Sequence, residues 1–119
     1  MKIVFLTNSI GFGGAEKMMA FVANSLCKRN HNVSIINFNT VAEEINSSLQ
    51  TFDSRICVSS YSGVKNGQLA RLKRLAFAFK NISKDNADVI IGFTAFPNYA
   101  GRIVGSLKGI PSIMSERGN

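Results

Sequence analysis

Three glycines, Gly11, Gly13 and Gly14, lie between an apolar segment and a helical pattern near the start of the chain. The apolar segment, residues 2–7, is a nearly continuous run of the kind that forms a buried parallel strand. A strand, a glycine-rich turn and a helix N-terminus bring bare backbone and unpaired N–H groups close to a ligand. Because the helix end carries a partial positive charge, a phosphate or diphosphate is the expected occupant. The alternative interpretation is that the glycines only permit a tight turn.

Apolar runs and helical periodicities alternate along nearly the whole chain. Strands are predicted over 2–7, 33–38, 55–59, 88–93 and 110–114, and helices over 15–29, 68–84 and 99–108. Pro97 suits the start of the last helix and Gly109 its end. Residues 40–52 combine helical spacing with polar residues, so we expect a short helix or an irregular segment there.

This alternation predicts a Rossmann-like α/β fold with three αβα layers and a mostly parallel sheet joined by right-handed crossovers. In such sheets, ligands bind outside the carboxyl ends of the strands. Three polar or glycine-rich segments are expected to converge at that edge, namely 8–16, 92–98 and 115–119.

The length of 119 residues is that of one domain, and no apolar run approaches the ~20 residues that span a bilayer. No secretory signal is recognisable. Cys27 and Cys57 are isolated in the sequence, so we expect buried, reduced thiols in a cytoplasmic protein. The single histidine, His31, follows the first predicted helix, and no residue spacing suits a zinc site. No metal or cofactor is predicted.

The charge is strongly positive, with a formal net charge of +7. Six of the 14 basic residues lie in one stretch without an acidic neighbour: Lys65, Arg71, Lys73, Arg74, Lys80 and Lys84. This stretch is either a solvated helix face or a surface attracted to an anionic membrane. Binding to nucleic acid is the weaker alternative, because no recognised nucleic-acid-binding motif accompanies the charge.

The glycine cluster does not match the dinucleotide fingerprint G-x-G-x-x-G. Gly11 and Gly13 fill its first two positions, but the third falls on Glu16. The predicted strand 33–38 ends without the carboxylate that binds a ribose, and no Walker motif is present. No catalytic triad can be assembled either. Glu16 and Glu116 are the acidic residues placed at carboxyl ends of strands, and Glu16 either stabilises the helix dipole or binds a polyhydroxylated ligand.

Two motifs about a hundred residues apart carry a resemblance to a known family. Gly13-Gly14-Ala15-Glu16 follows the first strand, and residues 111–119 form a Pro-led strand that ends in Ser-Glu-Arg-Gly-Asn. Both resemble the N-terminal domain of a GT-B glycosyltransferase of the retaining family 4. The segment 88–93 resembles the strand between them, so that the likeness covers all 119 residues. Many members carry a histidine after the strand that corresponds to 110–114. Glu116 and Arg117 stand there instead, as in a Ser-Glu-Arg subgroup.

The resemblance implies two Rossmann-like domains with the active site in the cleft between them. Residues 1–119 would be a partial N-terminal domain that mainly holds the acceptor, and the C-terminal donor-binding domain is absent from this sequence. The backbone of Gly13 and Gly14 would contact the donor diphosphate, and Glu16 would contact sugar or acceptor hydroxyls. Glu116, Arg117 and Asn119 would line the cleft. Retaining enzymes of this kind are thought to react on the front face of the sugar without a protein base, so we expect no catalytic residue here and an inactive isolated chain.

The expected partners are a nucleotide-sugar donor, a polysaccharide or lipid-linked acceptor, the missing domain and an anionic membrane surface, with no nucleic acid. The expected location is the cytoplasm, with peripheral attachment to the inner face of the plasma membrane. Two alternatives remain open. The first alternative to the two-domain enzyme is a non-catalytic nucleotide- or anion-binding Rossmann module. The second is the acceptor subunit of a split glycosyltransferase.

Overall fold

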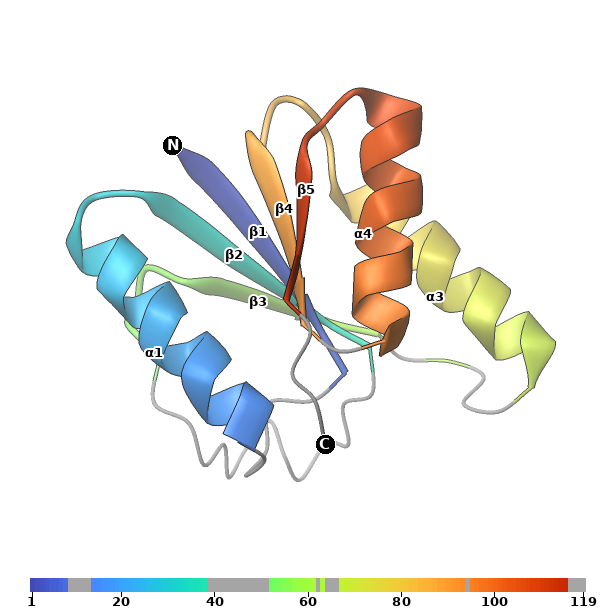
Figure 1. Ribbon diagram of the computed structural model, residues 1–119, viewed down its shortest axis with the longest axis horizontal. Coiled ribbons are helices and arrows are strands. Elements are labelled where there is room, and N and C mark those ends of the chain that lie inside the picture. The colour runs from blue at the N-terminus through green and yellow to red at the C-terminus, as the bar shows by residue number, and fades with distance from the viewer. Residues whose placement is uncertain (9–13, 39–51, 62, 64–66, 94, 116–119) are drawn as a thin grey trace.

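A computed structural model describes residues 1–8, 14–38, 52–61, 63, 67–93 and 95–115, with only the backbone for residues 14–16 (Figure 1). The strands are β1 (Lys2–Thr7), β2 (Asn32–Asn37), β3 (Cys57–Ser60), β4 (Val89–Phe93) and β5 (Ser112–Ser115). The helices are α1 (Gly14–Lys28), α3 (Gln68–Asn81) and α4 (Ala95–Lys108). A short helix or irregular structure was expected for residues 40–52, of which residues 40–51 lie outside the described residues.

The five strands form one parallel sheet in the order β3-β2-β1-β4-β5. From the central strand β1, the chain first builds outward to β2 and β3, and then returns to the other side of β1 to build β4 and β5 (Figure 1). All carboxyl ends therefore meet at one edge, and the strand order reverses between β1 and β4. Such a switch point opens a crevice between neighbouring crossovers.

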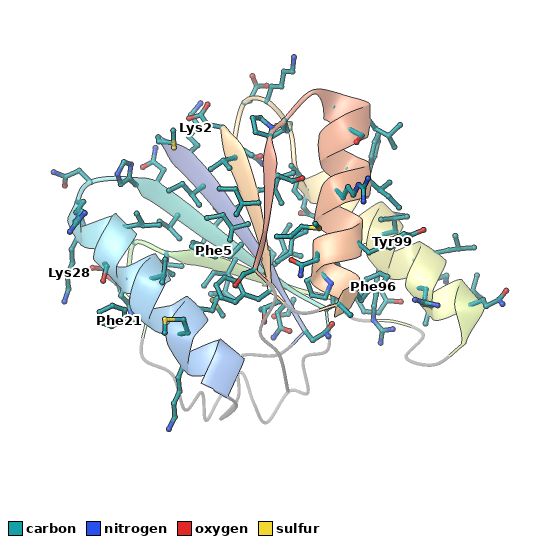
Figure 2. The ribbon with its side chains drawn as sticks, viewed as in Figure 1. Lys2, Phe5, Phe21, Lys28, Phe96 and Tyr99 are labelled. Carbon is teal, nitrogen blue, oxygen red and sulfur yellow. The ribbon has the colours of Figure 1, made fainter. Side chains whose placement is uncertain are left out.

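Helices cover both faces of the sheet, as predicted. The side chains of β1 alternate between the two faces of the sheet. Ile3 and Phe5 join the cluster beneath α1, whereas Val4 and Leu6 join the cluster beneath α3 and α4. Figure 2 labels Phe5 within the sheet. All four side chains are buried, which explains why the strand has a continuous apolar sequence. Each such side chain contributes about 1.5–3 kcal/mol through burial. The αβα layers expected from the sequence are confirmed.

The element bounds differ from the predictions mainly at the helices. α4 begins at Ala95 rather than at residue 99, so Pro97 is its third residue, in a first turn whose N–H groups need no intrahelical acceptor. Gly109 ends this helix with a φ of 69°, as expected. α3 ends at Asn81, because Ile82 is extended after its N–H bonds to the Ala78 carbonyl.

Two predicted strands are shorter or shifted. β5 begins at Ser112 rather than at residue 110, and β3 begins at Cys57 rather than at residue 55.

The prediction that both cysteine thiols are buried is wrong for one of the two. Cys27, on α1, is buried against the sheet, but Cys57 is exposed on β3, the strand at one edge of the sheet that the described residues form. Both cysteines are free thiols.

Candidate functional site

Polar residues occupy the carboxyl ends of four of the five described strands, and the other one, β4, ends at Phe93. Thr7 of β1 lies opposite Asn37 of β2, which lies opposite Ser60 of β3. Across the switch point, Phe93 of β4 lies opposite Ser115 of β5. Thr7 and Asn37 are both buried. This row marks the edge where a parallel sheet of this kind binds its ligands.

Backbone hydrogen bonds extend the order of the sheet slightly past the strands. The Phe38 N–H donates to the Thr7 carbonyl at 3.0 Å, and the Tyr61 N–H donates to the Asn37 carbonyl at 2.8 Å. The edge therefore offers a fixed backbone to anything that docks against it.

Two helices begin at this edge, and their N-termini point the positive ends of their dipoles toward it. α1 begins at Gly14, a short distance in sequence after β1, and α4 begins at Ala95, directly after β4. In Figure 1 both helices begin toward the lower part of the picture, where β1 and β4 end. The prediction that the glycine cluster leads into a helix is confirmed at Gly14.

The other predicted binding residues lie where the structure describes little. Gly13, Glu116, Arg117 and Asn119 are outside the described residues, and only the backbone of Glu16 is described, in the first turn of α1. The structure does bring the described flanks of the predicted segments, Asn8, Gly14 and Ser115, to the same edge of the sheet. The binding roles of the predicted residues stay predictions.

Two arginines of α3 also reach the carboxyl edge, which the sequence analysis did not foresee. The Nε of Arg74 donates to the Phe38 carbonyl at 3.0 Å, and its guanidinium carbon lies 5.2 Å from the centre of the Tyr61 ring. The guanidinium carbon of Arg71 lies 5.8 Å from the centre of the Phe96 ring, in the first turn of α4. These contacts have cation–π geometry. The sequence did contain one indication of this arrangement. Arg71 and Arg74 are three residues apart, which places them on the same face of a helix.

A groove of about 280 Å³ lies between α3 and α4, close to the start of both helices. It is lined by Gln68, Arg71, Leu72, Leu75, Phe96 and Tyr99. Leu72 and Tyr99 are exposed although they are large and apolar, and Figure 2 shows Tyr99 and Phe96 on the side of α4 that borders α3. The groove thus combines apolar walls with one guanidinium group.

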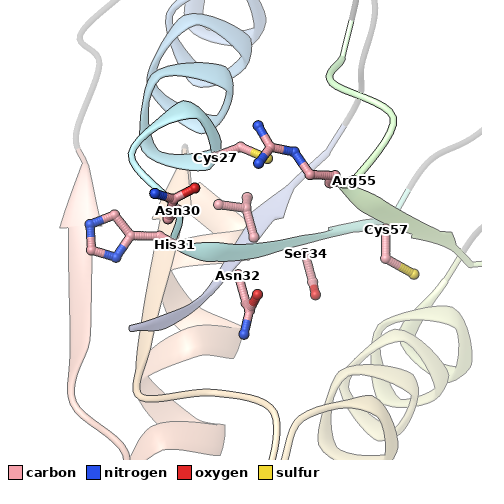
Figure 3. A pocket seen from close by; sticks show the side chains of 8 residues that line it. Cys27, Asn30, His31, Asn32, Ser34, Arg55 and Cys57 are labelled. Carbon is pink, nitrogen blue, oxygen red and sulfur yellow. The ribbon is translucent and has the colours of Figure 1, made fainter.

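A second cavity of about 300 Å³ lies at the opposite, amino-terminal end of β2 and β3 (Figure 3). It contains His31, which is far from the carboxyl edge, as predicted, together with Arg55 and both cysteines. The side chain and backbone N–H of Arg55 both bond to Asp53, and these bonds hold the pKa of Asp53 well below its usual range. Among the described residues, no three His, Cys, Asp or Glu side chains are grouped so that they could hold a metal.

Within the described residues, no helix is both long and apolar enough to cross a membrane.

No family model matches the sequence. A curated relative is the GalNAc-alpha-(1->4)-GalNAc-alpha-(1->3)-diNAcBac-PP-undecaprenol alpha-1,4-N-acetyl-D-galactosaminyltransferase of Campylobacter jejuni, which is 30% identical over 126 aligned residues. The alignment covers 100% of this chain and 33% of the relative. The chain thus spans about a third of the length of the curated relative that it matches.

Solved structures show the same fold at lower identity. MurG of Acinetobacter baumannii has a TM-score of 0.68 and 22% identity, over 98% of this chain and 35% of its own. UGT2 of Phytolacca americana, complexed with UDP-2fluoro-glucose and pterostilbene, has a TM-score of 0.69 and 15% identity, over 99% of this chain and 31% of its own. The fold is that of a GT-B glycosyltransferase domain. At these identities the structures establish the fold alone, and the Campylobacter relative adds sequence similarity to a glycosyltransferase.

Proposed function

We propose that this chain is the acceptor-side portion of a glycosyltransferase. The parent enzyme transfers a sugar from a nucleotide-sugar donor to a hydroxyl of a polysaccharide or lipid-linked acceptor, with retention of configuration. The observation that carries the proposal is the carboxyl edge, where five parallel strands end and α1 and α4 begin. The similarity of the whole chain to a named glycosyltransferase supports it.

In this proposal, the backbone of Gly13 and Gly14 approaches the donor diphosphate at the start of α1, where N–H groups lack intrahelical partners. Glu16 contacts hydroxyls of the sugar or the acceptor. Glu116, Arg117 and Asn119 follow β5 and line the cleft. The donor-binding residues that remain belong to a C-terminal domain in the rest of the protein.

Retention by a front-face reaction, as in family 4, needs no base from this chain. The donor phosphate takes the proton of the acceptor hydroxyl as the new glycosidic bond forms and the bond to the diphosphate breaks. His31 is consistent with this, because it lies at the opposite edge of the sheet and is too remote to serve as a base. The chain's part in the reaction is to orient the acceptor and to stabilise the diphosphate.

The chemistry of the acceptor follows from the surface around α3 and α4. The groove between these helices suits an apolar segment next to an anion, because Leu72, Tyr99 and Arg71 line it together. The Campylobacter relative is named for an acceptor linked through PP to undecaprenol. We therefore infer a lipid-linked acceptor, presented from the inner face of the plasma membrane.

The basic stretch is expected to attach the chain to anionic lipid. Changing Lys73, Lys80 and Lys84 to glutamine removes three exposed cations of this stretch. At about 1 kcal/mol per basic residue near the surface, binding to anionic vesicles should weaken about 100-fold. Sedimentation with phosphatidylglycerol vesicles measures this, and neutral phosphatidylcholine vesicles should bind the native chain weakly.

The matched control changes Lys17, Lys28 and Arg29, which are exposed on and just after α1, to glutamine. This variant has the same net charge as the first and should keep most of the binding. Equal losses in the two variants, or equal binding of the native chain to neutral and anionic vesicles, would reduce the basic stretch to a solvated face.

The transferase activity itself is tested by turnover of nucleotide sugars. The isolated chain should show none, and the same residues joined to the region encoded after Asn119 should transfer sugar to a lipid-diphosphate acceptor. Turnover by the isolated chain would contradict the two-domain proposal. A stop codon directly after Asn119 would instead favour the split enzyme, and tighter binding of NAD than of nucleotide sugars would favour a non-catalytic Rossmann module.

A further inference from the structure

Asn98, in the first turn of α4, is a polar side chain in a position where an apolar one would be expected. It is only 7% exposed and lies among the buried residues with which α4 covers the sheet. Its Nδ2 donates a hydrogen bond to the carbonyl oxygen of Ser115 at 3.2 Å. Ser115 is the last residue of β5, so this bond ties the start of α4 to the end of the neighbouring strand.

The other side of Asn98 lies against β4. A Cβ added to Gly92 would lie 2.7 Å from Asn98 Oδ1, 2.9 Å from Asn98 Cα and 2.9 Å from the Pro97 carbonyl oxygen. The backbones of β4 and α4 therefore approach as closely as a glycine allows. Asn98 is fixed on one side by this approach and on the other by its bond to Ser115.

The amide of Asn98 is only partly satisfied. Its Oδ1 is buried and accepts no hydrogen bond from the part of the chain that the structure describes. Burying a polar group without its full set of partners is unfavourable, and an apolar residue would avoid this penalty. What an apolar side chain could not supply is the donor that Asn98 gives to the Ser115 carbonyl.

We propose that Asn98 is a positioning residue that fixes the direction in which the chain leaves β5 at Ser115. The next residues in the sequence are Glu116 and Arg117, to which the proposed function gives a place in the cleft, and the inference rests on that proposal. Asn98 does not contact the reacting groups in this scheme. It acts through the backbone of β5, as an anchor for the segment that carries them.

The test compares variants of Asn98 with a matched control. Asn98→Asp keeps the shape but replaces the donor by a second acceptor, and Asn98→Leu keeps approximately the volume without a polar group. Asn81→Asp is the control, because Asn81 Nδ2 also donates to a backbone carbonyl, that of Phe77 at 2.7 Å, on α3 away from β5. All three variants are made in the complete chain.

The readouts are the ¹³C shift of the Ser115 carbonyl and the hydrogen exchange of amides 114–117. Both Asn98 variants should move the Ser115 carbonyl signal and speed exchange of these amides about tenfold, which corresponds to ~1.4 kcal/mol. Asn81→Asp should leave both unchanged, even where it lowers global stability. Unchanged signals at Ser115 in Asn98→Asp, or equal effects in the control, would overturn the inference.

Titration with UDP-N-acetylglucosamine, carried out on these residues joined to the region encoded after Asn119, separates this inference from the proposed function. If the native chain binds and the Asn98 variants bind about tenfold more weakly, the anchor serves the site. If the native chain binds and the variants bind equally well, the positioning role is refuted. If the joined protein without a substitution at Asn98 fails to bind at millimolar concentration, the proposed function loses its support, while the carbonyl shift and exchange still decide whether Asn98 fixes the end of β5.

Discussion

Gly92→Ala is expected to destabilise the protein by about 3 kcal/mol, near the upper end of what overpacking of a core costs. The added Cβ would meet backbone atoms, the Asn98 Cα and the Pro97 carbonyl oxygen, at 2.9 Å. Backbone cannot swing aside as a flexible side chain can, so β4 and α4 must separate. Because small domains have only about 5–15 kcal/mol of stability in total, urea unfolding should show a large fall in the midpoint.

Gly101→Ala is the matched control within α4. A Cβ there would meet only side-chain atoms, Ile90 Cγ2 at 3.2 Å and Leu6 Cδ1 at 3.4 Å, which can shift slightly. Alanine also favours a helix over glycine by up to about 1 kcal/mol, so the net change should stay within about 1 kcal/mol. A similar midpoint for Gly92→Ala and Gly101→Ala would show that the close approach of β4 and α4 is not rigid.

Gly14→Val is expected to weaken binding of a nucleotide sugar at least about tenfold, while the free energy of unfolding changes by less than about 1 kcal/mol. Gly14 is the first residue of α1, where a side chain would stand in the path of a diphosphate that approaches the N–H groups. Valine is no worse than glycine inside a helix, so folding should be preserved. Isothermal titration with UDP-N-acetylglucosamine, on these residues joined to the region encoded after Asn119, measures the affinity, and urea unfolding measures the stability.

The control for Gly14→Val is Phe21→Val on the same helix. Phe21 is 70% exposed and lies a full two turns from the helix start (Figure 2). The Phe21→Val substitution should leave both the affinity for the nucleotide sugar and the free energy of unfolding nearly unchanged. Native affinity in Gly14→Val would remove Gly14 from the site.

The central strands could be predicted from the sequence because most of their side chains are buried. Residues 2–7 and 88–93 have the continuous apolar runs that such strands require, and both form strands in the structure within one residue of the predicted bounds. Cys57 was assigned wrongly because a strand's apolar pattern does not say whether it lies at the edge of the sheet. That property depends on the strand order, which is a non-local feature.

The chemistry of the carboxyl edge was harder to foresee than its location. The sequence placed the segment 92–98 there, but Asn98 owes its role to a contact with Ser115 seventeen residues away. Arg74 likewise reaches the end of β2 across thirty-six residues, at the Phe38 carbonyl, and local periodicity carries no information about such a contact. Both contacts, that of Asn98 with Ser115 and that of Arg74 with Phe38, could be recognised only once the order of the strands was known.

Binding of nucleotide sugar at the start of α1 is tested most directly by residue-resolved titration of the ¹⁵N-labelled chain joined to the region encoded after Asn119. With UDP-N-acetylglucosamine, the amide signals of Gly13, Gly14 and the residues after β4 and β5 should shift together and saturate, and NAD should produce much smaller changes. Shifts confined to the cavity around His31 and Arg55, or a response to NAD as strong as that to the nucleotide sugar, would contradict the account.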